Sequence, residues 1–140
     1  MKKNSMNLDP RLAADSLEIA DLPLSHLRLM NDQRYPWLLL IPRRSEVREL
    51  VDLSSGDQQI LLQEINMVSH MVQSLWQPYK LNIAALGNVV AQLHVHIVGR
   101  FQEDKAWPKP VWGIGEAQKY LASEANTLIM LMRKHLEKNN

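Results

Sequence analysis

Residues 92–98 read Gln92-Leu93-His94-Val95-His96-Ile97-Val98, and this stretch decides both the expected fold and the expected chemistry. Because strand side chains point to opposite faces with a period of two, we predict a strand over residues 91–101. In that strand Gln92, His94 and His96 share one face, and the apolar residues between them enter the opposite layer. Same-face residues lie about 7 Å apart along a strand, so both imidazoles can address one small substrate.

The segments before this strand predict a sheet and a helix. An early strand and a second strand, Trp37–Ile41, are expected within residues 17–41, joined by a turn over residues 31–36. Ser54 followed by Asp57, or Ser55 followed by Gln58, offers a helix N-cap. The helix then carries one apolar stripe and closes at Pro78; the stripe comprises Leu61, Ile65, Val68, Val72 and Leu75.

The rest of the chain completes an α+β pattern. A strand over residues 80–86 leads through Gly87-Asn88 into the histidine strand, and a terminal helix is expected over residues 116–138. That helix carries near one face Leu121, Leu128, Met132 and His135. The order strand, strand, helix, strand, strand, helix predicts an α+β fold, with an antiparallel sheet, one central helix and one C-terminal helix.

Length and composition restrict the class of protein. A chain of 140 residues with 46% hydrophobic side chains fits one domain over residues 1–140, with residues 1–10 expected to be a flexible N-terminal segment. The absence of cysteine excludes disulfides, a thiolate nucleophile and cysteine-bound metals. A net charge of +1 argues against a general nucleic-acid binder. With no secretory signal and no apolar run long enough for a bilayer, we expect a soluble cytoplasmic protein without membrane contact.

Three interpretations of the two histidines remain open. They can simply fill an amphipathic strand. They can bind a metal, for which His26 is the plausible additional ligand. In the third interpretation, a neutral imidazole attacks a phosphoryl group while its other nitrogen holds a proton against a carbonyl oxygen.

At this point the sequence resembles the histidine triad (HIT) hydrolases and transferases over residues 17–112. The resemblance rests on the apolar strand that ends in Ile41-Pro42 before two arginines, and on the segment from Asn82 through Gly87-Asn88 to His94 and His96. It implies that His94 is the nucleophile on the α-phosphate of a nucleotide and that His96 supports the nucleophile and the phosphate. It also implies ribose contacts from Asp32 and Asn31 and phosphate contacts from Asn82 and Asn88.

The chain departs from the family pattern at several of these positions. Gln92 stands where the family has its first histidine, so a hydrogen bond is kept but no proton or charge is carried. Val89 stands where a Ser or Thr commonly assists the leaving group, Asn88 stands for a Gln, and Asn82 is one residue closer to the nucleophile. Because Gln92 and Val89 weaken the catalytic pattern, a nucleotide-binding regulatory module with little or no catalysis is the alternative function.

The resemblance implies a reaction at the α-phosphate through a nucleotidyl-histidine intermediate. The expected substrates are a dinucleoside polyphosphate, as in diadenosine tetraphosphate hydrolases, a nucleoside phosphoramidate or an adenylate. No cofactor is required, although a divalent cation can accompany a polyphosphate substrate. The resemblance also implies a homodimer, and the segment from Trp107 to Gly113 is expected near a nucleotide site.

Overall fold

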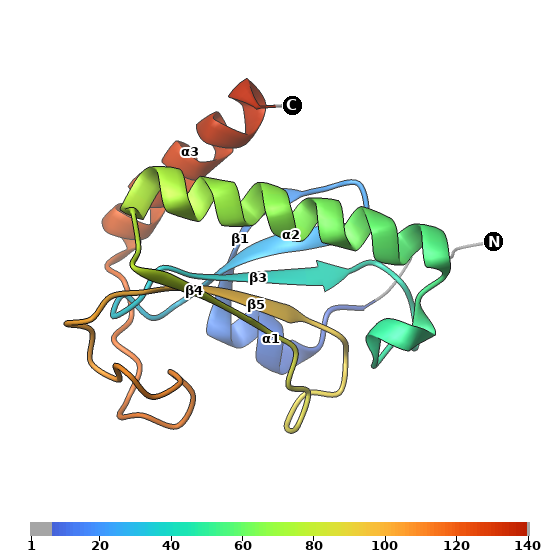
Figure 1. Cartoon of the computed structure of the whole chain (residues 1–140), viewed down its shortest axis with the longest axis horizontal. Helices are drawn as coiled ribbons and strands as arrows, with labels where there is room; N and C mark the ends of the chain where they lie inside the picture. Colours follow the sequence, from blue (N-terminus) through green and yellow to red (C-terminus); the bar gives the residue numbers. More distant parts are fainter. Residues whose placement is uncertain (1–6, 140) are drawn as a thin grey trace.

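The structure, a computed structural model, describes residues 7–139 and contains one five-stranded antiparallel sheet with strand order β1-β2-β3-β5-β4 (Figure 1). The elements in chain order are α1 Pro10–Asp15, β1 Ser16–Asp21, β2 Ser25–Met30, β3 Trp37–Pro42, the 3-10 helix η1 Leu50–Asp52, α2 Ser55–Trp76, β4 Lys80–Ala84, β5 Val95–Arg100 and α3 Ala122–Lys138. The predicted α+β fold with a central and a C-terminal helix is therefore confirmed.

The first part of the chain holds one strand more than predicted. Two strands, β1 and β2, form a hairpin where a single early strand was expected, and the turn is closed by Leu22 N–H donating to Ser25 O at 2.8 Å. Buried leucines and isoleucine recur on both sides of this turn, so the apolar pattern hides it. Pro23 supplies the break, because it has no N–H for a continuing ladder.

The N-terminal segment contains a short helix that the sequence did not indicate. Asp9 caps α1 by accepting a hydrogen bond from Arg11 N at 2.8 Å, and Pro10 occupies the first helical position. The expectation of a flexible segment over residues 1–10 falls largely on residues 1–6, which lie outside the described residues. Asn7 and Asp9 are hydrogen-bonded to Gln92 in the loop before β5.

The central helix follows the prediction closely. Ser54 caps α2 by accepting from Asp57 N at 3.1 Å. The helix ends at Trp76, and its C-cap Gln77 takes the left-handed conformation just before Pro78. Leu61, Val68 and Val72 of the predicted stripe are buried against the sheet, while Ile65 and Leu75 are partly buried there.

The C-terminal helix is shorter than predicted. It begins at Ala122 rather than at residue 116, because backbone groups of the preceding residues bond to the β2–β3 loop instead. Gln118 O accepts from Gln33 N at 2.7 Å and Tyr120 N donates to Asn31 Oδ1 at 2.9 Å. The prediction for the inner face was also wrong in part, since Leu121 is exposed; the buried residues are Ala125, Ile129, Met132 and Leu136.

Two cores occupy the two faces of the sheet. The helices α2 and α3 cover one face with a mainly aliphatic core, whereas α1 and the segment after β5 pack on the other face (Figure 1). The second core contains Tyr35, Trp37, Leu39 and Val98. Across the described part of the chain, no helix combines the length and the apolar character needed to span a bilayer.

Candidate active site

The strand that carries the histidines begins later than predicted. β5 starts at Val95 rather than Ala91, so Gln92 and His94 lie in the connection that leads into it. In the β3–β5 register Val95 faces Leu40, and β3 ends two residues further on at Pro42, which has no N–H to extend the ladder. Leu93 N instead donates to Val47 O at 3.0 Å. His94 is therefore placed by loop hydrogen bonds and not by strand pairing.

The hydrogen bond of His94 fixes which ring nitrogen is free. His94 Nδ1 lies 2.7 Å from the backbone oxygen of Gln92. Because a carbonyl oxygen only accepts, Nδ1 must carry the hydrogen, and in the neutral imidazole Nε2 keeps its lone pair. This is the tautomer that the nucleophilic interpretation requires.

The second histidine has the opposite arrangement. Trp37 Nε1 donates to His96 Nδ1 at 3.0 Å, so the hydrogen of the neutral His96 ring resides on Nε2. Burial, together with a smaller contribution from the neighbouring His94, lowers the pKa of His96 to about 3. The two ring centroids are 4.9 Å apart. The structure therefore places one nitrogen with a free lone pair beside a ring that stays neutral and offers an N–H.

A cleft with aromatic walls lies beside His96, whose ring neighbours two tryptophans of the cleft lining. Its volume is about 270 Å³, and Trp37 and Trp112 belong to its lining. The ring of Trp112 is perpendicular to that of His96, with centroids 5.1 Å apart. Trp112 Nε1–H is buried and has no hydrogen-bond partner among the described residues. Since buried donors are almost always satisfied, this indole is suited to bind an acceptor on a ligand.

Asn31 and Asp32 also line the cleft, but their polar atoms already have partners. Asp32 binds the guanidinium of Arg34 with both carboxylate oxygens at 2.8–3.2 Å and accepts from Gln118 N at 3.3 Å. Burial acts to raise the pKa of Asp32, but the hydrogen bonds from Arg34 and Gln118 outweigh it and lower the pKa. Asn31 Oδ1 accepts from Tyr120 N. Both side chains thus hold the segment before α3.

Asn82 and Asn88, the two other predicted asparagines, have different surroundings. Asn82 Oδ1 accepts from Arg100 at 2.8 Å, and Arg100 is itself buried in an ion pair with Asp104 at 2.9 Å. In the β4–β5 pair Asn82 lies opposite Val98, and Ala84 of the same strand lies opposite His96. Asn88 is exposed in the β4–β5 connection.

The metal interpretation lacks a ligand set in the structure. Among residues 7–139 no group of three His, Asp or Glu side chains is placed to hold a metal ion. His26, the plausible extra ligand, is instead hydrogen-bonded to Asp21 across the β1–β2 hairpin.

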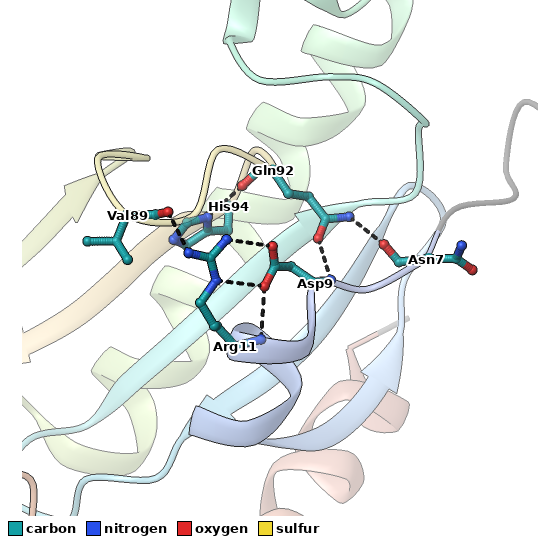
Figure 2. Close-up of polar contacts among 6 residues, drawn as sticks. All are labelled: Asn7, Asp9, Arg11, Val89, Gln92 and His94. Carbon is teal, nitrogen blue, oxygen red and sulfur yellow. Dashed lines mark hydrogen bonds and ion pairs between the residues drawn. The ribbon is translucent and has the colours of Figure 1, made fainter.

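Gln92 makes contacts that the sequence did not indicate. Its backbone oxygen binds His94, while its side chain turns to the N-terminal segment (Figure 2). Oε1 accepts from Asp9 N at 2.8 Å and Nε2 donates to Asn7 O at 3.1 Å. Residues 7–11 lie more than 80 positions from Gln92 in sequence, so no local pattern could have revealed the contact.

Known proteins are similar to this chain in sequence and in fold. The family model of the HIT domain matches residues 11–103, which is most of the chain. The chain belongs to the HIT family. This family comprises nucleotide-binding hydrolases and transferases, together with members that are not catalytic.

Three solved HIT proteins are similar over nearly the whole chain. A histidine triad protein from Bradyrhizobium japonicum is 44% identical, with a TM-score of 0.91, covering 94% of this chain and 98% of its own. One from Sinorhizobium meliloti is 40% identical, with a TM-score of 0.92 and coverages of 95% and 98%. One from Marinobacter aquaeolei is 39% identical, with a TM-score of 0.92 and coverages of 96% and 98%. No curated protein matches the chain.

Proposed function

We propose that the protein is a nucleotide hydrolase or nucleotidyl transferase that acts at the α-phosphate through a covalent intermediate on His94. The observation that carries this proposal is the hydrogen bond from His94 Nδ1–H to the Gln92 carbonyl, which leaves Nε2 as the nucleophilic atom. His96 supports the reaction as a neutral donor, because Trp37 occupies its Nδ1 and burial prevents its protonation.

The reaction has two steps. Nε2 of His94 forms a bond to the α-phosphorus while the bond to the leaving group breaks, and the electron pair stays on the leaving atom. Water, or another acceptor in a transfer reaction, then attacks the same phosphorus, releases His94 and loses a proton. His96 Nε2–H is suited to bind a non-bridging phosphate oxygen during both steps, where charge develops.

The cleft beside His96 is the proposed nucleoside site. Its lining contributes the two indoles Trp37 and Trp112, whose faces and edges suit a flat base, and the unpartnered N–H of Trp112. At about 270 Å³ it is of the size of a small-ligand pocket. The homodimer implied by the family resemblance remains part of this proposal.

Turnover of a nucleotide substrate by two histidine variants tests the proposal. His94→Ala should abolish hydrolysis, because the attacking atom is lost. His96→Ala should leave measurable turnover, because only support is lost. Thermal unfolding of both variants checks that each remains folded. Equal activity of wild type and His94→Ala would overturn the proposal, and nucleotide binding without turnover by wild type would favour the nucleotide-binding regulatory module.

The contact of Asp32 with a ribose stays a prediction. The alternative is that Asp32 only holds its loop, through its hydrogen bonds with Arg34 and Gln118. Because Arg34 already occupies both carboxylate oxygens, a ribose must share or displace that pairing. If it does, wild type binds AMP more tightly than 2′-deoxy-AMP, and Asp32→Ala narrows the difference. Calorimetric titration of both nucleotides into both proteins measures this. An unchanged ratio with lower stability would assign Asp32 to the loop alone.

A further inference from the structure

Gln92 holds the N-terminal segment by a pair of hydrogen bonds of a particular geometry. Its amide accepts from Asp9 N and donates to Asn7 O, two backbone groups that are two residues apart on one segment (Figure 2). An amide presents its donor and acceptor side by side, so it can bind both groups as a neighbouring strand would. The two nitrogens of an imidazole lie at different edges of the ring and cannot reproduce this pairing.

The segment held in this way brings Arg11 to the loop before His94. Arg11 Nη1 donates to Val89 O at 3.0 Å, and Asp9 binds Nε and Nη2 of the same guanidinium at 3.2 and 3.1 Å. A guanidinium has five N–H donors, and these bonds engage three of them. The side chain is 57% exposed. Two donors of an oriented cation therefore face solvent beside Val89, whose own side chain offers no donor.

Two observations relate this cation to the nucleophile. Val89 lies in the same β4–β5 connection as His94, and the carboxylate of Asp9 interacts electrostatically with His94 as well as with Arg11. Figure 2 shows the Arg11 and His94 side chains on one side of Asp9, whereas the Gln92 side chain lies on the other. The Arg11 guanidinium thus lies against the connection that carries the nucleophile, on the side of Asp9 that His94 occupies in Figure 2.

We propose that Arg11 binds the anionic leaving group of the substrate and that Gln92 is the positioning residue that holds Arg11 in place. The inference rests on the proposed function and assigns to this site a phosphoric anhydride, such as a dinucleoside polyphosphate, in preference to a nucleoside phosphoramidate. When the P–O bond of an anhydride breaks, the electron pair moves to a phosphate oxygen, and the guanidinium stabilises that charge through charge-assisted hydrogen bonds. An amine leaving from a phosphoramidate gains a proton and offers no such anion.

The test compares the two substrate classes in matched variants. Arg11→Gln should lower kcat/KM for diadenosine tetraphosphate by about ten- to a hundredfold, and lower it less than about threefold for an adenosine phosphoramidate of a neutral amine. Arg11→Lys should recover part of the loss because it keeps the charge. Lys134→Gln removes a charge from exposed α3 and should change neither value. An equal effect of Arg11→Gln on both substrates would overturn the inference.

A double-mutant cycle tests the role of Gln92. Gln92→Ala should shift the substrate ratio in the same direction as Arg11→Gln, and the double variant should lose little more than the larger single effect. Additive losses would overturn the positioning role. His94→Ala separates this inference from the proposed function. If it abolishes turnover of both substrates while Arg11→Gln leaves their ratio unchanged, only the inference fails, whereas full activity of His94→Ala refutes both.

Discussion

The face of the sheet under α2 and the face that carries His96 differ in what fills them. Under α2 the core is almost entirely aliphatic, and regular helices supply the covering residues. On the opposite face the core, here called the aromatic core, combines Tyr35 and Trp37 with aliphatic residues. It is bordered by buried polar groups, including His94, His96, Asp32 and Arg100. Loops and the short α1 cover this second face. The first face stabilises the fold mainly by apolar burial, with a buried hydrogen bond from Leu24 N to Glu64 of α2. The second face uses hydrogen bonds to orient reactive groups.

The strand β3 runs between these two environments and shows the difference within two residues. Leu38 packs in the aliphatic core and Leu39 in the aromatic core, and both are fully buried. In the sheet register Leu39 is opposite His96. Neighbouring leucines on one strand thus serve different purposes, because successive side chains point to opposite faces.

Replacing each of these leucines separates stability from activity. Leu38→Ala and Leu39→Ala should each lower the free energy of unfolding by about 3 kcal/mol, since each leaves a cavity in a dense core. Only Leu39→Ala should also lower the activity per folded molecule, because it removes packing beside His96. Denaturant unfolding and turnover below the unfolding transition measure both quantities. Equal activity of the two variants would show that the two faces are not functionally distinct.

Acid should lower the free energy of unfolding through His96, which lies on the second face of the sheet. The unfolded chain protonates His96 near its ordinary pKa of 6.5, whereas the folded protein does so only near the lowered value of about 3. The unfolded state therefore binds more protons between these values, and stability falls as the pH falls through that window. We expect a loss of about 2 kcal/mol between pH 6.5 and pH 4.5.

His96→Gln provides the control for this pH dependence. Glutamine can still accept from Trp37 but does not titrate, so the slope of stability against pH should become clearly shallower. Urea unfolding at several pH values measures the slope in both proteins. The same slope in wild type and variant would assign the acid sensitivity to other groups.

The smallest expected effect concerns Gln92. Gln92→His should fold and change the turnover rate by about tenfold or less, equivalent to about 1.4 kcal/mol. The His94 hydrogen bond uses the backbone of residue 92 and is kept, so the change comes from losing the side-chain pairing with Asn7 and Asp9. Steady-state kinetics with one nucleotide substrate suffice. A gain of several orders of magnitude would instead indicate a disabled triad and favour a binding module.

The two faces also differ in how far the sequence predicted them. Apolar periodicity and a Ser54 cap predicted α2 and its buried stripe, since a long amphipathic helix against a sheet repeats one simple pattern. Alternation brought His94 and His96 to neighbouring positions, although the strand begins only at Val95. The late start depends on Pro42 of another strand, which a pattern local to residues 91–101 cannot reveal.

Local sequence patterns did not predict the side-chain hydrogen bonds around the site. Trp37 lies in a strand that is apolar on both faces, so periodicity did not show that its indole binds His96. The contact of Gln92 with Asn7 and Asp9 joins distant segments through single side chains. Arg34 was likewise missed as the partner of Asp32, although only Gln33 separates them. A nearby arginine and aspartate in a turn were a signal for that pair.

The central claim is that His94 Nε2 forms a covalent bond to phosphorus. The most direct measurement is to mix the protein with a nucleotide labelled at the α-phosphate, quench the reaction within milliseconds at alkaline pH and map the label by mass spectrometry. A nucleotidyl group is expected on His94 in wild type, at a higher level in His96→Ala if breakdown is slowed, and at no level in His94→Ala. Turnover without label on His94 at any time, or label that persists in His94→Ala, would contradict the account.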